Sequence, residues 1–237
     1  MTFYDLVSFE VACRLGNLKN SASALCCSEL AADPAQNLPT RELLCIGDVG
    51  GSLTVFELKP FFNLSEETLL MGNMLNEING ILSGTREQVH RDWVTKVKFV
   101  PDLDLLVTAS LDSTIQLYDV HKRVMIRKFT RHRSGVRAFD WCQTGKFIVS
   151  GGISRSLQVW NPYTVDSMAT LDGHAAPVVD VVVDDNNSRV ISVSLDKMLK
   201  CWDVSTLRCI QTVMDESVYR PDDQVHALFW DAAQVRA

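Results

Sequence analysis

Residues 173–203 read GHAAPVVDVVVDDNNSRVISVSLDKMLKCWD, and this stretch decides the fold. Short apolar runs alternate in it with clusters of Pro, Asp and Asn, which is the composition of β-strands joined by turns. A further apolar run follows after residue 208. The connections are short enough for hairpins. The stretch therefore predicts one antiparallel four-stranded sheet, with strands over 178–183, 189–194, 198–202 and 209–213.

The same pattern recurs every 42 residues, which is the spacing of His90, His132 and His174. A fixed period of this length is typical of supersecondary units that stack because a single unit cannot bury both of its faces. Gapless repeats therefore cover 90–131, 132–173 and 174–215. Other sets that obey the step are Thr108, Ser150 and Ser192; Tyr118, Trp160 and Trp202; Val94, Val136 and Val178; and Ile115, Leu157 and Leu199.

Gly173-His174 and Trp202-Asp203, at their separation, resemble the signature of the WD40 repeat family, whose repeats run about 40 to 45 residues. The resemblance implies a β-propeller of four-stranded blades. It also implies a structural relay in each repeat that joins a His, a turn Asp, a strand Ser or Thr, and a Trp. The residues at these positions are His90, Asp112, Thr108 and Tyr118; His132, Ser150 and Trp160; and His174, Asp196, Ser192 and Trp202. Ser154 replaces the Asp of the middle repeat, so that relay is expected to be incomplete.

The flanks carry weaker versions of the pattern. Residues 21–58 are expected to form a diverged blade, 1–15 the last half of another, and 216–237 the start of a further one, with its first strand at 225–230. The expected fold class is all-β, a WD40 β-propeller segment of about four blades plus two partial ones. Because the pattern starts and stops within a blade, we expect a segment of a longer array.

Residues 59–89 interrupt the repeat. Apolar residues at Leu70, Met74 and Ile78 have helical spacing, and Asn63 with Glu66 has the form of a helix start. A helix is therefore predicted in this insertion. It is either a partner-binding arm or, more commonly for an amphipathic stripe, a helix packed on a blade edge.

One basic stretch stands out: Lys122, Arg123, Arg127, Lys128, Arg131, Arg133 and Arg137. It could meet an acidic partner surface or a phosphate backbone. Since it covers an outer strand and the following loop, a solvated rim is the favoured interpretation. No aromatic platform is interleaved with it, as single-stranded nucleic acid would require.

Composition excludes several classes. With 46% hydrophobic and 22% charged residues, the chain is an ordinary globular protein, and its apolar runs are too short to cross a membrane as helices. Asp5 and Glu10 interrupt any secretory signal. The seven cysteines form no C-x-x-C pair and are expected to be reduced, and the net charge of −6 disfavours a nucleic-acid partner. We expect a cytoplasmic protein, with a cilium or flagellum as the alternative location.

The His, Asp and Ser residues of the relay resemble a catalytic triad. A catalytic group is needed once, however, whereas these residues recur in every repeat. No zinc-protease, phosphate-loop or nucleophile-elbow motif is present. We therefore expect no enzyme activity, catalytic residue, metal, cofactor or small-molecule substrate.

The resemblance to WD40 proteins implies a scaffold for protein–protein interactions whose partners are other proteins. The expected contact residues flank the first strand of each repeat: Asp92, Trp93, Thr95, Arg133, Arg137, Pro177 and Val179. Trp93 is the leading one because aromatics dominate binding hot spots. Alternatives are a structural component of cilia or flagella and a substrate receptor of a ubiquitin ligase. The receptor is less favoured because no Trp-Asp pair is followed by an Arg two residues later.

Overall fold

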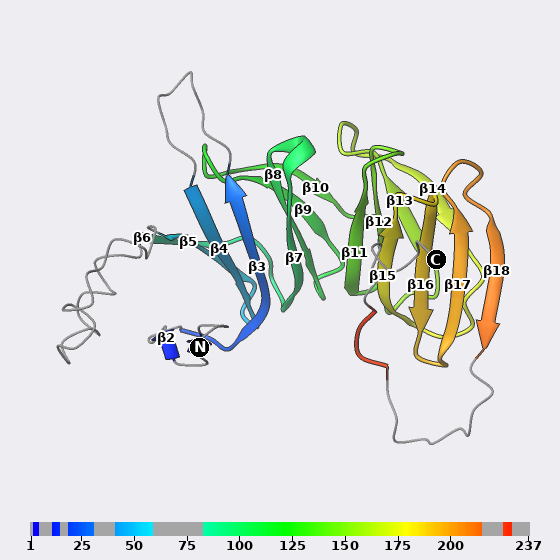
Figure 1. Cartoon of the computed structure of the whole chain (residues 1–237), viewed down its shortest axis with the longest axis horizontal. Helices are drawn as coiled ribbons and strands as arrows, with labels where there is room; N and C mark the ends of the chain where they lie inside the picture. The colour runs from blue at the N-terminus through cyan, green and yellow to red at the C-terminus, as the bar shows by residue number, and fades with distance from the viewer. Residues whose placement is uncertain are drawn as a thin grey trace.

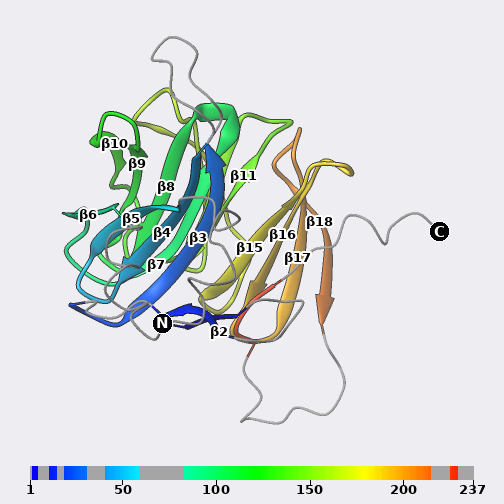
Figure 2. The same cartoon turned by 60° about the vertical axis from the view of Figure 1, so that its left-hand side comes forward.

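The structure is a computed structural model that describes residues 2–4, 11–14, 19–30, 41–58, 83–214 and 225–228. Within these ranges the chain forms β-strands and one short 3-10 helix, η2 (Pro101–Leu103), and no α-helix. The strands make four antiparallel sheets of four strands and one sheet of two strands. The fold is therefore all-β, as the sequence predicts, and the four-stranded sheets stand side by side as propeller blades (Figures 1 and 2).

Each blade is a meander in which consecutive strands pair. Blade 1 holds β3 (Ala22–Leu30), β4 (Arg41–Asp48), β5 (Ser52–Leu58) and β6 (Ser83–Gln88). Blade 2 holds β7 (Val94–Val100), β8 (Leu105–Ser110), β9 (Ile115–Asp119) and β10 (Val124–Phe129). Blade 3 holds β11 (Val136–Cys142), β12 (Phe147–Gly152), β13 (Leu157–Trp160) and β14 (Ser167–Leu171). Blade 4 holds β15 (Val178–Asp184), β16 (Arg189–Ser194), β17 (Met198–Asp203) and β18 (Cys209–Met214). The two-stranded sheet pairs β1 (Thr2–Tyr4) with β2 (Val11–Arg14).

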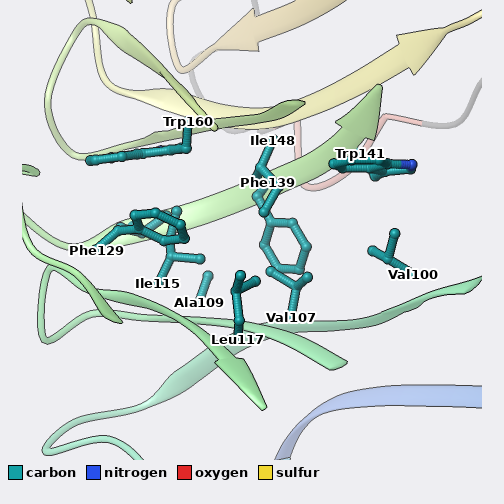
Figure 3. Packing of buried hydrophobic residues seen from close by; sticks show 11 residues of the cluster. Val100, Val107, Ala109, Ile115, Leu117, Phe129, Phe139, Trp141, Ile148 and Trp160 are labelled. Carbon is teal, nitrogen blue, oxygen red and sulfur yellow. The ribbon is translucent and has the colours of Figure 1, made fainter. Parts of the chain in front are cut away.

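The core lies between the blades, because neighbouring sheets pack face to face. Between blades 2 and 3, Ile115 and Leu117 face Phe139 and Ile148, and Trp160 closes the cluster (Figure 3). All five side chains are fully buried. Burying a side chain of this size contributes roughly 1.5–3 kcal/mol, so these contacts hold the row of blades together.

Polar contacts join the first strands of neighbouring blades. The hydroxyl of Thr95 on β7 donates to the carbonyl of Val136 on β11 at 2.9 Å. The Val183 N–H on β15 donates to Asp140 on β11 at 2.8 Å, and Lys98 on β7 also bonds Asp140. The blades are therefore fixed against one another at their inner strands.

The last blade is less covered than the others. Leu117, Val159 and Cys201 occupy the same position in successive repeats. Leu117 and Val159 are fully buried, whereas Cys201 is half-buried. Likewise Leu157 is fully buried and Leu199 is half-buried. The face of blade 4 that points away from blade 3 is thus partly exposed in the described structure.

The structure corrects the boundary of the expected insertion at 59–89. Its last residues form β6, which pairs with β5 and completes blade 1. Asp48 explains why this strand is held: it accepts hydrogen bonds from Arg86 and from the Ser52 N–H. The predicted helix falls on 59–82, which lies outside the described residues.

Residues 225–228, within the expected first strand of a further blade, form no strand in the structure, and the expected blade at 216–237 stays a prediction. A first strand obtains its ladder from the second strand of its own blade, and no strand among the described residues pairs with this segment. The Leu228 N–H instead donates to Asp180 on β15 at 2.8 Å.

Candidate partner-binding site

The relay of blade 2 is the most complete. His90 Nδ1 lies 3.1 Å from a carboxylate oxygen of Asp112, and His90 Nε2 lies 2.8 Å from the Thr108 hydroxyl. A carboxylate can only accept, so Nδ1 carries the proton and Nε2 accepts from Thr108. Burial lowers the pKa of His90 even though Asp112 opposes that change. This histidine is a neutral structural group.

Tyr118 does not take the place of the relay Trp. The Glu87 carboxylate, on the outer strand of blade 1, lies near the Tyr118 hydroxyl. Burial, with the neighbouring Glu87 carboxylate, raises the pKa of this phenol, so it is a neutral donor. Tyr118 therefore ties blade 2 to blade 1.

In blade 3 the Ser150 hydroxyl links two relay members. It lies 2.6 Å from His132 Nε2, and Trp160 Nε1 donates to it at 2.7 Å. Ser154 stands at the Asp position, and both its hydroxyl and His132 Nδ1 are buried without a hydrogen-bond partner among the described residues. Burial lowers the pKa of His132 to about 4.

Blade 4 has every expected relay residue, yet one link is not formed. Ser192 lies 2.7 Å from His174 Nε2, and Trp202 Nε1 donates to Ser192 at 2.9 Å. In the part of the chain that the structure describes, His174 Nδ1 has no hydrogen-bond partner. Asp196 accepts instead from the Ser194 hydroxyl and the Met198 N–H.

The expected contact residues divide into exposed and buried groups. Trp93 is 52% exposed, and Asp92, Arg133 and Arg137 are also exposed. Val179 is buried on β15. The other two have roles in the fold: Thr95 bonds to Val136, and the Pro177 carbonyl accepts from the Leu195 N–H. The first four can therefore meet a partner directly, whereas the last three hold the frame.

A repeated backbone contact brings the loops before the first strands against the turns after the second strands. The N–H groups of Leu111, Ile153 and Leu195 donate to the carbonyls of Trp93, Gly135 and Pro177 at 3.0, 2.9 and 2.9 Å. We name this end of blades 2 to 4 the strand-start face: loops 90–93, 132–135 and 174–177 and turns 111–114, 153–156 and 195–197. In Figure 1, β16 points down, and its turn lies at the lower end of the blade.

The strand-start face carries apolar residues that reasoning from the sequence missed. Ile153 and Leu195 are 45% and 42% exposed, although both are large and apolar. Their equivalent in blade 2 is Leu111, which is half-buried. The 42-residue step would have revealed this set, because an apolar residue recurs at a turn position where polar residues are usual.

Much of the basic stretch is engaged within the fold. Arg127 bonds to the Pro162 carbonyl, Arg131 lies 3.2 Å from Asp166, and Lys122 lies 3.4 Å from Asp119. The ion pair between Arg131 and Asp166 joins the outer parts of blades 2 and 3. Only Arg133 and Arg137, at the end of the stretch, belong to or border the strand-start face.

The described ranges offer neither a metal site nor a membrane-spanning helix. They contain no group of three or more His, Cys, Asp or Glu placed to hold a metal ion. No helix within them is long and apolar enough to cross a membrane.

Comparison with known families matches the WD40 model (WD domain, G-beta repeat) to residues 83–119, 123–161 and 166–203. The chain is a WD40-repeat protein. Each WD40 match is offset from a blade, because it starts at the outer strand of one blade and ends at the third strand of the next. The first match runs from β6 to β9, which shows that β6 belongs to the repeat pattern.

Two WD40 relatives are informative. "Cilia- and flagella-associated protein 337 B" of Tetrahymena thermophila is 25% identical over 126 residues, which cover 53% of this chain and 10% of the relative. "UBP9-binding protein bun62" of Schizosaccharomyces pombe is 29% identical over 133 residues, which cover 54% of this chain and 23% of the relative. The chain thus matches less than a quarter of the length of either relative. WD40 domains typically bind other proteins and are generally non-enzymatic.

Proposed function

We propose that this chain is a non-enzymatic scaffold that binds other proteins through the strand-start face. The observation that carries the proposal is the row of exposed apolar side chains there, Trp93, Ile153 and Leu195, one in each of three successive blades. Water disfavours exposed side chains of this size, and partner docking removes them from it. Trp in particular is enriched among the residues that dominate binding energy.

The frame beneath these side chains supports binding. The backbone bonds of Leu111, Ile153 and Leu195 anchor each turn to the loop beside it. The hydroxyl of Ser110 adds a bond to the Asp92 carbonyl, next to Trp93. A surface that is already ordered loses little conformational entropy when a partner binds, so its contacts contribute more fully to affinity.

The relay geometry favours a role without catalysis. The three histidines are buried, and Thr108, Ser150 and Ser192 each bond to a histidine inside a blade rather than facing solvent. A nucleophile must reach its substrate. We therefore propose no catalytic residue, cofactor or small-molecule substrate.

The name of one relative also supports protein binding, because bun62 is described as UBP9-binding. A second candidate, a structural component of cilia or flagella, rests on the name of the Tetrahymena relative. Under this second candidate, the chain would act in a cilium rather than elsewhere in the cytoplasm. No observation favours a ubiquitin-ligase receptor.

The scaffold proposal is tested by quantitative affinity capture from lysate, with the native chain beside Trp93→Ala and Ile153→Ser/Leu195→Ser. Both variants should lose the same captured proteins while the thermal unfolding curve stays unchanged. Tyr163→Ala is the matched control, because Tyr163 is 66% exposed but lies in the connection between β13 and β14, at the other end of blade 3. Equal capture by all four proteins would refute binding through this face.

The ciliary candidate has its own test. A fluorescently tagged chain expressed in ciliated cells should concentrate along the axoneme and stay there after detergent extraction. Uniform cytoplasmic signal that washes out would remove this candidate and leave the scaffold proposal intact.

A further inference from the structure

Four arginines lie on or beside the strand-start face of blades 2 and 3. Arg91 and Arg133 follow the relay histidines of blades 2 and 3, Arg137 lies near the start of β11, and Arg155 lies in the turn after β12. Arg91, Arg133, Arg137 and Arg155 are exposed, and no hydrogen bond or ion pair joins their guanidinium groups to any other described residue. By contrast, Arg41 and Arg86 each hold a carboxylate within blade 1.

The carboxylates nearby are largely used within the fold. Asp112 bonds to His90 and to the Arg91 N–H, and Asp196 bonds to Ser194. Asp92 is exposed and accepts from the Trp93 N–H. Asp172 is the other exposed carboxylate near the loop before β15. The four arginines thus outnumber the exposed acids on this part of the face.

The other end of the blades carries charges of both signs, with Lys146, Arg189 and Arg208 among its basic residues. Its connections carry many carboxylates, among them Asp102, Asp104, Asp166, Asp185 and Asp203. All five have a partner inside the fold. Asp102 accepts from Trp141, Asp185 from the Thr144 N–H and Asp203 from the Thr206 N–H, while Asp166 pairs with Arg131 and Asp104 with His121. The chain has a net charge of −6, and the described part of the strand-start face in blades 2 and 3 carries more exposed arginines than exposed carboxylates.

The arginines and the apolar row form one continuous surface. A methyl group placed on Gly135 would lie 3.0 Å from Leu111, so the loop carrying Arg133 packs against the turn of blade 2. Leu111 in turn bonds to Trp93, and Ile153, beside Arg155, bonds to Gly135. Trp93 and Ile153 therefore flank the loop that carries the basic side chains.

We propose that the strand-start face binds an acidic protein segment, a short stretch with several Asp or Glu side chains and at least one large apolar side chain. The inference rests on the proposed scaffold function and states the chemistry of its partner. Arginine matches the geometry of a carboxylate with paired N–H donors, and Trp93 and Ile153 cover the apolar side chain. The local positive charge also speeds the approach of an acidic segment.

The test is selection from a random 12-residue peptide display library on the full chain, followed by fluorescence anisotropy with the selected peptides. Selected sequences should carry net negative charge and a Leu, Phe or Trp. An exposed ion pair changes affinity roughly 1.5- to 5-fold, so Arg133→Glu/Arg137→Glu should weaken binding about tenfold or more. Binding should also fall with rising salt, because exposed charge pairs are screened.

The matched control is Arg189→Glu/Arg208→Glu, the same charge change at exposed arginines on the other end of blade 4. It should leave peptide affinity within twofold of native, with thermal unfolding confirming that both variants fold. The proposal would be overturned if the selected peptides were neutral or basic, or if the control variant lost as much peptide affinity. It would also be overturned if the selection enriched no peptide at all. So would tighter binding of a 20-nucleotide single-stranded DNA than of the selected peptides.

These outcomes separate the two proposals. If Trp93→Ala releases the captured proteins but the arginine variants do not, the scaffold stands and the acidic partner is rejected. If neither releases them, the scaffold function of this face fails as well.

Discussion

At the scale of single residues, the three relays show that a shared motif does not guarantee shared bonds. Blade 2 links His90 to Asp112, and Thr114 supports both groups at hydrogen-bond distance. In blade 4 the residue at the Thr114 position is Met198, and Ser194 captures the carboxylate of Asp196. The bond of the relay therefore depends on neighbours that the motif does not include.

This comparison predicts a stabilising substitution in blade 3. The position of the competing serine is Gly152, and Ser156 occupies the Thr114 position. We expect Ser154→Asp to give His132 Nδ1 an acceptor and to raise the free energy of unfolding by about 1 kcal/mol. A hydrogen bond to a charged group stabilises the fold, and the cost of burying the carboxylate cancels only part of that gain. Urea unfolding measures it, with Arg155→Asp as the exposed control. A lower midpoint for Ser154→Asp alone would show that the carboxylate cannot reach the ring.

The buried His132 makes the fold sensitive to acid. Its pKa falls to about 4 in the fold, below the ordinary value of about 6.5, so the unfolded chain binds more protons between these values. Stability from this group is complete above about pH 6.5 and is lost as the pH falls toward 4, by roughly 2–4 kcal/mol. His90 and His174, whose pKa values are also lowered by burial, act in the same direction.

The measurement is urea unfolding at pH 7.5, 6.0 and 5.0 for the native chain, His132→Gln and His226→Gln. The first variant should reduce the loss of stability on acidification, whereas the second, which removes an exposed imidazole, should retain it. A native chain equally stable at all three pH values would contradict this account.

At the scale of elements, the regular repeats were predictable because one face of every strand is apolar at a fixed period. The outer strand β6 was not, since its sequence Ser-Gly-Thr-Arg-Glu-Gln contains no large apolar residue. Polar contacts hold it instead, from Arg86 to Asp48 and to the Ser52 hydroxyl. Hydrophobic periodicity detects strands that face a core, and an outer strand that lies at the rim escapes it.

The exposure of the expected contact residues was predictable only in part, and their role in binding stays a prediction. Trp93, Arg133 and Arg137 are exposed because they stand where loops meet the first strands. Val179 shares that sequence position with Arg137 yet is buried. Ile153 and Leu195 were missed because the rule that turns are polar hides an exposed apolar side chain until the structure shows it.

The role of β6 gives a test at this scale. Arg86→Ala should lower the free energy of unfolding by about 1–2 kcal/mol, because it leaves the mostly buried Asp48 carboxylate without its only cationic partner among the described residues. Arg123→Ala, at an exposed turn of blade 2, should change it by less than about 0.5 kcal/mol. Hydrogen exchange should show faster exchange of the β5 and β6 amides in Arg86→Ala only. Unchanged exchange in both variants would mean that the backbone ladder alone holds β6.

At the scale of the whole molecule, stability comes from blade-to-blade burial, and the two faces of a blade need not contribute equally. Blades 2 and 3 enclose the cluster of Figure 3, and blades 3 and 4 enclose another that includes Leu157 and Trp202. Beyond blade 4, the equivalent positions are half-buried. Burial at such interfaces stabilises an array of blades. The free energy that each residue contributes to folding should therefore follow its burial rather than its place in the motif.

Leu157 and Leu199 allow that idea to be measured, because they are the same residue type at the same repeat position. Leu157 is fully buried between two blades, so Leu157→Ala should cost about 3 kcal/mol through lost burial and the cavity left behind. Leu199 is half-buried on the outer face of blade 4, so Leu199→Ala should cost about 1 kcal/mol. Chemical unfolding of both variants at a single protein concentration gives the comparison. If Leu199→Ala costs as much as Leu157→Ala, something covers this face in solution, and sedimentation velocity then tests whether a second copy of the chain provides the cover.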